Sequence, residues 1–338
     1  MKNKLVCWRI MNNSFIETMK PFEGVPAYFS EGGFDFVEQS MVTPRRATKP
    51  NSFVDAVLTL SIGNRSHAYL EYVAPGGFTG TFSYIDKTLQ LGDLEKAATA
   101  LKLKRFRFVD YSPYFKFIAL DPSKRYIVKP EGFSDGRMQF LFDLSKMDIN
   151  HLVDYLDRKD YEGLRSQGVE FSLGAFESAQ KTDDKESKTQ EMFKEYAESY
   201  TGSASFFLME KIENVDQEFR IITDHLGEPY IAVERAVVES VAGFQQATGI
   251  LGHLPKIARG DAFEKLVPHG KEVRRLIKSM VAPMTGWDLY TTKDNKFGFF
   301  EYGVGWGCHN VPHADIVQEA RSYLVHCANK VMRHTASF

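Results

Sequence analysis

The stretch "RYIVKPEGFSDG", residues 125–136, places a lysine where an apolar run ends and a loop with two glycines begins. Because glycine lets the backbone approach a ligand closely, such a loop can surround a phosphate with N–H groups beside Lys129. The loop residues for this role are Gly132, Ser134 and Gly136. The spacing differs from a Walker loop, which needs Gly-Lys followed by Ser or Thr. A surface lysine before a proline turn is also compatible with these residues. The stretch alone therefore leaves open whether Lys129 binds a phosphate or is solvent-exposed.

The composition is that of a folded protein with two or three domains: 338 residues, 43% hydrophobic and 25% charged. A formal net charge of -2 lacks the excess of lysine and arginine that a nucleic-acid partner requires. Cys7, Cys308 and Cys327 are far apart and predict neither a disulfide framework nor a cysteine zinc site. The sequence has no secretory pattern and no run of roughly 20 apolar residues. We therefore expect a cytoplasmic protein with no membrane partner.

The order of patterns along the chain mixes strands and helices without a repeat, and predicts the fold class α/β (α+β). Strands are predicted over 56–63, 68–74, 105–111, 115–120, 126–130 and 204–212. Helices are predicted over 91–102, 146–164, 261–284 and 315–334, the second with Asp148 as its N-cap. Hairpins are predicted over 218–238 and 286–303, with turns at 224–227 and 293–296. The charged segment 180–199 is predicted either as a solvated surface segment or as part of a lid.

The second predicted hairpin carries an acid on each strand, Asp288 and Glu301. Acids on adjacent strands can lie opposite one another and share a hard cation such as Mg²⁺, which takes few protein carboxylates and keeps substrate phosphate in its other positions. Two exposed acids near a hairpin are the plain alternative. Against it, "GWDLY" and "GFFEYG" surround each acid with apolar residues and glycine, a costly setting for an unpaired charge. Both interpretations stay open at this point.

A third segment, "FFLMEKIENVDQEFRI" (residues 206–221), is an apolar strand that ends in an acid and leads through a short linker into the next strand. An adenine ring needs an acceptor for its amino group and a backbone N–H for its ring nitrogen, and a ribose needs an acceptor for its hydroxyls. Glu210 at the strand end, followed by Glu218 and Arg220, can supply such groups. An ordinary strand end is the alternative.

Taken in order, the three segments resemble the ATP-grasp family, in particular its ligases that join a carboxylate to an amine; the resemblance covers about residues 85–307. The resemblance implies that Lys87, in an Asp-Lys pair, and Lys129 lie at the phosphates of ATP, with the backbone of Gly132 to Gly136 over them. It implies that Glu210 and the backbone of Lys211 and Ile212 contact the adenine, and that Glu218 contacts the ribose. It also implies Arg220 and Arg235 at phosphate or acyl phosphate, and Asp288 and Glu301 as Mg²⁺ ligands. Gly303 stands where the family has an asparagine, so one expected metal ligand is missing.

The resemblance implies an ATP-dependent carboxylate-amine ligase that forms an amide through an acyl phosphate and releases ADP and phosphate, with ATP and Mg²⁺ as cofactors. The acceptor would be a small molecule, a peptide or a protein terminus. The implied domains are an N-terminal α/β domain over 1–86, a central ATP-grasp lid subdomain over 87–205 and a C-terminal ATP-grasp subdomain over 206–338. Two alternatives stay open: a small-molecule kinase on the same fold, and a nucleotide-binding protein with little turnover.

Overall fold

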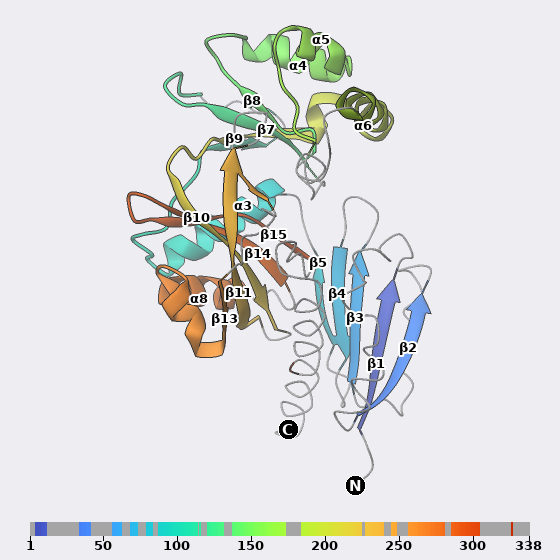
Figure 1. Ribbon diagram of the computed structural model, residues 1–338, viewed down its shortest axis with the longest axis vertical. Coiled ribbons are helices and arrows are strands. Elements are labelled where there is room, and N and C mark those ends of the chain that lie inside the picture. Colours follow the sequence, from blue (N-terminus) through green and yellow to red (C-terminus); the bar gives the residue numbers. More distant parts are fainter. Residues whose placement is uncertain are drawn as a thin grey trace.

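The computed structural model describes residues 4–11, 34–41, 56–62, 68–73, 79–83, 87–113, 115, 120–131, 137–173, 184–224, 227–239, 245–248, 256–280, 285–304 and 326. Helices and three sheets alternate along this part of the chain, so the α/β fold class is confirmed. Figure 1 shows the three sheets as separate groups of strands.

The N-terminal sheet has five strands in the order β2-β1-β3-β4-β5. Its strands are β1 (Lys4–Met11), β2 (Phe34–Met41), β3 (Ala56–Ile62), β4 (Ala68–Val73) and β5 (Thr79–Ser83). β1 pairs parallel with β2 and β3, whereas β3, β4 and β5 pair antiparallel in succession. The strands predicted over 56–63 and 68–74 are confirmed as β3 and β4.

A second group of elements, which we call the four-stranded layer, has a sheet of order β6-β9-β7-β8 with three helices packed on it (Figure 1). The elements are β6 (Tyr111–Pro113), β7 (Tyr126–Pro130), β8 (Phe140–Phe142), α4 (Ile149–Asp157), α5 (Tyr161–Ser166), α6 (Lys185–Ser199), the 3₁₀ turn η6 (Gly202–Ser205) and β9 (Phe206–Glu210). The sheet and helices share one apolar core, in which Val128, Phe140 and Leu156 are fully buried.

Two local predictions in this layer can be compared with the structure. Asp148 caps α4, since its carboxylate accepts a hydrogen bond from the N–H of Asn150. The charged segment 180–199 contains α6, which is not solvated on all sides: Phe193 and Tyr196 pack into the core of the layer. Its charged residues cover the outer side, which explains why its composition alone resembles a surface segment.

The six-stranded layer consists of a sheet of order β12-β11-β10-β14-β15, with β13 added at β11, and the helices α3, α7 and α8. Its elements are α3 (Lys87–Ala100), β10 (Val215–Thr223), β11 (Pro229–Glu239), β12 (Gln245–Thr248), β13 (Ile257–Arg259), the 3₁₀ turn η7 (Gly260–Ala262), α7 (Phe263–Leu266), α8 (Gly270–Met280), β14 (Thr285–Thr292) and β15 (Phe297–Val304). Both predicted hairpins are present, as β10 with β11 and β14 with β15.

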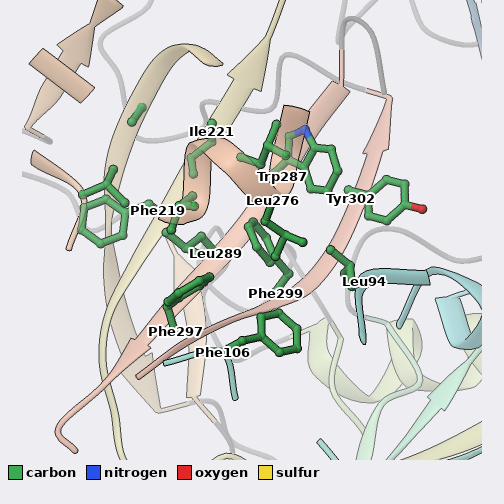
Figure 2. Packing of buried hydrophobic residues seen from close by; sticks show 14 of the residues in the cluster. Leu94, Phe106, Phe219, Ile221, Leu276, Trp287, Leu289, Phe297, Phe299 and Tyr302 are labelled. Atoms are coloured by element: carbon green, nitrogen blue, oxygen red, sulfur yellow. The ribbon is translucent and has the colours of Figure 1, made fainter. Parts of the chain in front are cut away.

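The core of the six-stranded layer lies between one face of this sheet and helices α3 and α8. Figure 2 shows its aromatic centre, where the ring of Trp287 stacks on Tyr302 at 4.5 Å and meets Phe299 edge-on at 5.5 Å. Leu94 of α3 and Leu276 of α8 close this cluster. Burial of so much aromatic surface fixes the sheet as a rigid platform.

Three predicted elements are wrong in detail. The helix predicted over 146–164 is two helices, α4 and α5, separated by residues 158–160, where Lys159 has a φ of 57°. Residues 105–111 do not form a strand: Phe106 bridges to Phe297, Phe108 is 51% exposed, and β6 begins only at Tyr111. The chain passes here from one sheet to the other, so no single partner strand continues. The helix predicted over 261–284 breaks into α7 and α8 at Pro268, because the residue before a proline avoids the helical region.

A third apolar cluster joins the two layers: it contains Leu91 of α3, Phe207 and Met209 of β9, and Tyr290 of β14. Alternate residues of β9 thus face the core of the four-stranded layer and the six-stranded layer. α3 packs against the six-stranded sheet although the division at 86/87 assigns it to the lid; the domain boundaries stay a prediction. The predicted strand 115–120 and helix 315–334 lie largely outside the described residues.

Candidate functional site

The strands of the six-stranded layer alternate between an apolar face and a charged face. On β10, Phe219 and Ile221 point into the core, whereas Glu218 and Arg220 alternate with them. The register places Arg220 opposite Asp288 of β14, and Glu218 opposite Arg235 of β11. Directly opposed residues share a face of the sheet, so these four side chains lie on the face away from the core.

A β-bulge in β15 brings Glu301 to the charged face. Leu289 pairs with Phe299 and Asp288 pairs with Glu301, so Phe300 is an extra residue that this register leaves unpaired across the strands. Strict alternation would place Glu301 on the same side as Phe299, inside the core. The extra residue reverses the alternation. Glu301 therefore lies directly opposite Asp288 on the charged face.

Asp288 is held by two guanidinium groups. Arg220 Nη1 lies 2.8 Å and Arg235 Nη1 2.9 Å from the same carboxylate oxygen, Oδ1. Burial by itself raises the pKa of Asp288, but the two arginines more than offset it and hold this pKa below its usual range. A Cβ added at Gly286 would lie 2.7 Å from Arg220 Nε, so the absence of a side chain there leaves room for the guanidinium.

Glu301 is paired with Lys87, the first residue of α3, at 3.0 Å between Nζ and Oε2. α3 is held against β15 at a second point, where the N–H of Tyr302 donates to Gln90 Oε1 at 3.2 Å. The helix therefore projects its first side chain over the end of β15. Sequence reasoning placed Lys87 in the site, and the structure brings it there next to Glu301.

Lys129 enters the same region from the four-stranded layer. Its ammonium lies 5.6 Å from the ring centroid of Phe300, and no acid in the described part of the chain forms an ion pair with it. The pKa of Lys129 is lowered to about 8, mainly by burial and also by the nearby ammonium of Lys87. The carboxyl groups of Glu301, Glu218 and Asp288 offset part of this effect. A bound anion would stabilise this buried ammonium, which has no ion-pair partner in the described residues.

Glu218 is the most buried acid of the group, with 4% of its surface exposed. Its Oε1 has no hydrogen-bond partner among the described residues. Burial raises the pKa of Glu218 to about 8, although Arg235 and Lys129 act in the opposite direction. The carboxyl group is therefore mostly neutral at pH 7, and one of its oxygens has an unfilled hydrogen-bonding position.

The charged cluster, defined as Lys87, Lys129, Glu218, Arg220, Arg235, Asp288 and Glu301, contains four cationic side chains and three carboxyl groups. With Glu218 protonated, two carboxylates face four cations. Such an excess of positive charge in a partly buried site attracts a multiply charged anion. The arrangement can therefore bind a polyphosphate and stabilise negative charge that develops on it.

Glu210 lies outside this cluster. Its carboxylate accepts a hydrogen bond from Arg107 Nη2 at 2.7 Å and lies 3.5 Å from Lys124 Nζ. The N–H of Lys211 donates to the carbonyl of Arg125. These contacts occupy the Glu210 side chain and the Lys211 N–H that the sequence assigned to an adenine. In contrast, Ile212 N–H has no protein acceptor in the described residues.

Asp288 and Glu301 satisfy part of what a magnesium ion needs. Two opposed carboxylates suit Mg²⁺ when phosphate or water supplies the other ligands. Within the described residues no group of three His, Cys, Asp or Glu side chains could hold a metal ion. Gly303, opposite Gly286 in the register, adds no ligand. The pair therefore fits a metal that arrives with phosphate, since a bare ion would meet two carboxylates already paired with cations.

Gly132, Ser134 and Gly136 lie outside the described residues, so their role at a phosphate stays a prediction. Sequence reasoning missed Glu131, whose carboxylate reaches the start of α3. The signal was present, because an acid follows "VKP" directly, but its partner is forty-four residues earlier. No helix in the described part of the chain is long and apolar enough to cross a membrane.

Several solved structures resemble this chain. D-alanine–D-alanine ligase from Bacillus anthracis matches with a TM-score of 0.46 and 10% identity over 98% of this chain and 99% of that chain. The D-cycloserine synthetase DcsG matches with a TM-score of 0.46 and 10% identity over 96% and 99%. The ATP-grasp ligase PsnB, complexed with its minimal precursor, matches with a TM-score of 0.39 and 10% identity over 95% and 100%.

No family model and no curated protein matches the sequence. Because the TM-scores of the solved structures lie below 0.5, the function of this chain is inferred from its own side chains.

Proposed function

We propose that the chain is an ATP-dependent ligase of the ATP-grasp type that joins a carboxylate to an amine through an acyl phosphate. The observation that carries the proposal is the charged cluster, whose four cations exceed its carboxylates and suit a polyphosphate. The order of the motifs along the sequence supports it. Cations from both layers meet in one place, as a site that must surround a nucleotide requires.

In this proposal Lys87 and Lys129 neutralise the polyphosphate, and Arg220 and Arg235 neutralise the phosphoryl group that is transferred. A substrate carboxylate oxygen attacks the γ-phosphorus, the bond from this phosphorus to the bridging oxygen breaks, and ADP leaves. An amine then attacks the acyl carbon, inorganic phosphate leaves with the electron pair of the C–O bond, and the nitrogen loses a proton to solvent. The fixed cations stabilise charge in both steps.

The nucleoside end is assigned to two groups with open hydrogen-bonding positions. Ile212 N–H can donate to a ring nitrogen of the adenine. Glu218, neutral at pH 7 because its pKa is about 8, can accept from or donate to a ribose hydroxyl. Glu210 is then a residue that holds the linker through Arg107, with its side chain away from the base.

Asp288 and Glu301 would hold Mg²⁺, which would supply positive charge to neutralise phosphate oxygens. For this, Arg235 and Lys87 would exchange their contacts with these acids for contacts with phosphate. A second candidate, a nucleotide-binding protein with little turnover, is favoured by one observation: Gly303 brings no third ligand beside the two acids.

Binding is tested first, with thermal unfolding and calorimetric titration of ATP with and without Mg²⁺. Millimolar ATP should stabilise the wild-type protein. Lys129→Met should abolish this stabilisation because it removes the buried ammonium. Lys146→Met is the matched control, since the side chain of Lys146 is 81% exposed, and should bind as the wild type does. A wild-type protein that ignores millimolar ATP contradicts the proposal.

The reaction is tested by ATP-to-ADP conversion against pairs of carboxylates and amines, with the product identified by mass. An amide that forms only when both substrates are present supports the ligase. A phosphorylated product would instead identify a kinase. If ATP binds but no pair is converted, and Asp288→Asn and Glu301→Gln change no measurable reaction, the protein binds nucleotide with little turnover.

A further inference from the structure

The geometry points to Glu131 as a positioning residue that fastens the strand carrying Lys129 to the helix that begins with Lys87. This inference rests on the proposed function, because it concerns how the two lysines of that site are held at a fixed separation. Glu131 belongs to the four-stranded layer by its place directly after β7. Its partners belong to α3, which packs in the core of the six-stranded layer.

Two hydrogen bonds make the connection. The N–H of Lys87 donates to Glu131 Oε2 at 2.8 Å, and the hydroxyl of Thr88 donates to Oε1 at 2.8 Å. Both carboxylate oxygens are thus engaged by the first turn of α3, where N–H groups have no partner within the helix. Glu131 is 9% exposed and Thr88 is 5% exposed, so water competes little for these bonds.

The charge of Glu131 suits this place. A carboxylate at a helix N-terminus is stabilised by the helix dipole, and hydrogen bonds to an ionised acceptor are stronger than neutral ones. A glutamine could use only one oxygen and would turn an amide toward the second donor. The contact therefore needs glutamate, and it needs the two layers to be in the observed relative position.

The consequence for the site follows from connectivity. Lys129 is two residues before Glu131 on a strand whose five residues are all buried, so the carboxylate and the ammonium move together. Lys87 contributes both the N–H that binds Glu131 and the side chain whose ammonium lies 3.0 Å from Glu301. Without Glu131, no contact between its carboxylate and α3 opposes the repulsion between the ammonium groups of Lys87 and Lys129. The positions of the two lysines relative to Phe300 and Glu301 are then no longer fixed.

The contact itself is tested in the full chain without nucleotide, by amide hydrogen exchange at the first turn of α3. In Glu131→Gln and Glu131→Ala the amide of Lys87 should exchange about tenfold faster or more than in the wild type, because a buried charged hydrogen bond is lost. Glu186→Gln is the matched control: Glu186 forms an exposed paired contact with Arg165 in the same layer. Unchanged exchange in Glu131→Ala would overturn the inference.

The positioning role is tested by titrating ATP and adenosine separately. Glu131→Ala should weaken ATP binding about tenfold and leave adenosine affinity within about twofold, since only the phosphates meet the lysines. Thr88→Val, which removes one hydrogen bond and keeps the carboxylate, should give a smaller loss of the same kind, and it serves if Glu131→Ala does not fold. Equal losses for ATP and adenosine would mean a merely structural role and overturn the inference.

The two proposals fail in different ways. If the wild-type protein binds neither ATP nor adenosine, the proposed function fails, while the exchange at Lys87 still decides whether Glu131 holds the helix. If ATP binds and the exchange at Lys87 is insensitive to Glu131, the proposed function stands and this inference fails.

Discussion

The two faces of the six-stranded sheet are built from the same strands and serve opposite purposes. One face buries Phe219, Trp287 and Phe299 in an apolar core, and the other presents the charged cluster. The core face gains free energy from every buried ring, whereas the charged face buries ions at a cost. Since alternate residues of each strand serve the two faces, the register decides which residue takes which role. Stability and binding are therefore predicted to respond to different substitutions.

Deletion of Phe300 should have the largest effect. Without this extra residue, Glu301 would turn toward the core and Tyr302 toward the charged face. Burial of an unpaired carboxylate, together with the loss of the Tyr302 stack on Trp287, should cost more than about 5 kcal/mol and leave the protein unfolded or aggregated. Circular dichroism and thermal unfolding measure the effect.

The control for this deletion is Phe300→Ala, which keeps the residue count and hence the register. It loses the ring, whose centroid lies 4.5 Å from that of Tyr290 and 5.6 Å from the ammonium of Lys129, and should cost about 1 to 3 kcal/mol. If the deletion and the substitution unfold at the same denaturant concentration, the bulge does not set the two faces.

Phe299→Ala tests the core face alone. Phe299 is 2% exposed and lies in the aromatic centre of the core, so truncation leaves a cavity and should cost about 3 to 5 kcal/mol. Urea titration measures the loss. At temperatures where the variant stays folded, its ATP affinity should remain within about twofold of the wild type. A large loss of affinity in the folded variant would show that the two faces do not act separately.

The sequence was sufficient for the core face and only partly sufficient for the charged face. Hairpin turns and apolar alternation predicted the hairpins, and the carboxylates of Asp288 and Glu301 do lie opposite each other. The bulge at Phe300 was not predicted, because the letters "GFFEYG" are compatible with either register. Glu131 and Arg107 were also missed, since each acts through a partner far away in the chain. Long-range contacts of this kind depend on packing, which no local pattern encodes.

Glu218→Gln tests the cost of the charged face through its pH dependence. The pKa of Glu218 is about 8 in the folded protein, whereas its ordinary value, which we take for the unfolded chain, is 4.5. Between these pH values the folded state keeps a proton that the unfolded state has released, so the contribution of Glu218 to stability falls as the pH rises from about 4.5 to 8. The Glu218→Gln variant lacks this pH dependence. Its free energy of unfolding relative to that of the wild type should therefore rise by roughly a few kcal/mol between about pH 4.5 and pH 8.

Urea titrations at pH 4, 6 and 8 measure this difference. The Phe299→Ala variant is the control, because its loss of stability comes from a cavity and should stay nearly constant over the same pH range. A Glu218→Gln variant whose stability runs parallel to that of the wild type would mean that Glu218 is ionised in the folded state, and would remove the neutral carboxyl group from the charged cluster.

Gly286→Ala should have the smallest effect on stability and a selective effect on binding. A Cβ at this position would lie 2.7 Å from Arg220 Nε, so the guanidinium must move away from Asp288, at a cost of about 1 kcal/mol. ATP affinity should fall several-fold because the arginine no longer faces the phosphate.

Gly92→Ala is the control: its Cβ would lie 3.1 Å from the hydroxyl of Tyr111, away from the cluster, and affinity should not change. In an Arg220→Ala background, Gly286→Ala should have no further effect on affinity, because the guanidinium that it displaces is gone. Additive losses would instead mean that the methyl group acts on the sheet itself, and the separation of the two faces would then not hold at this position.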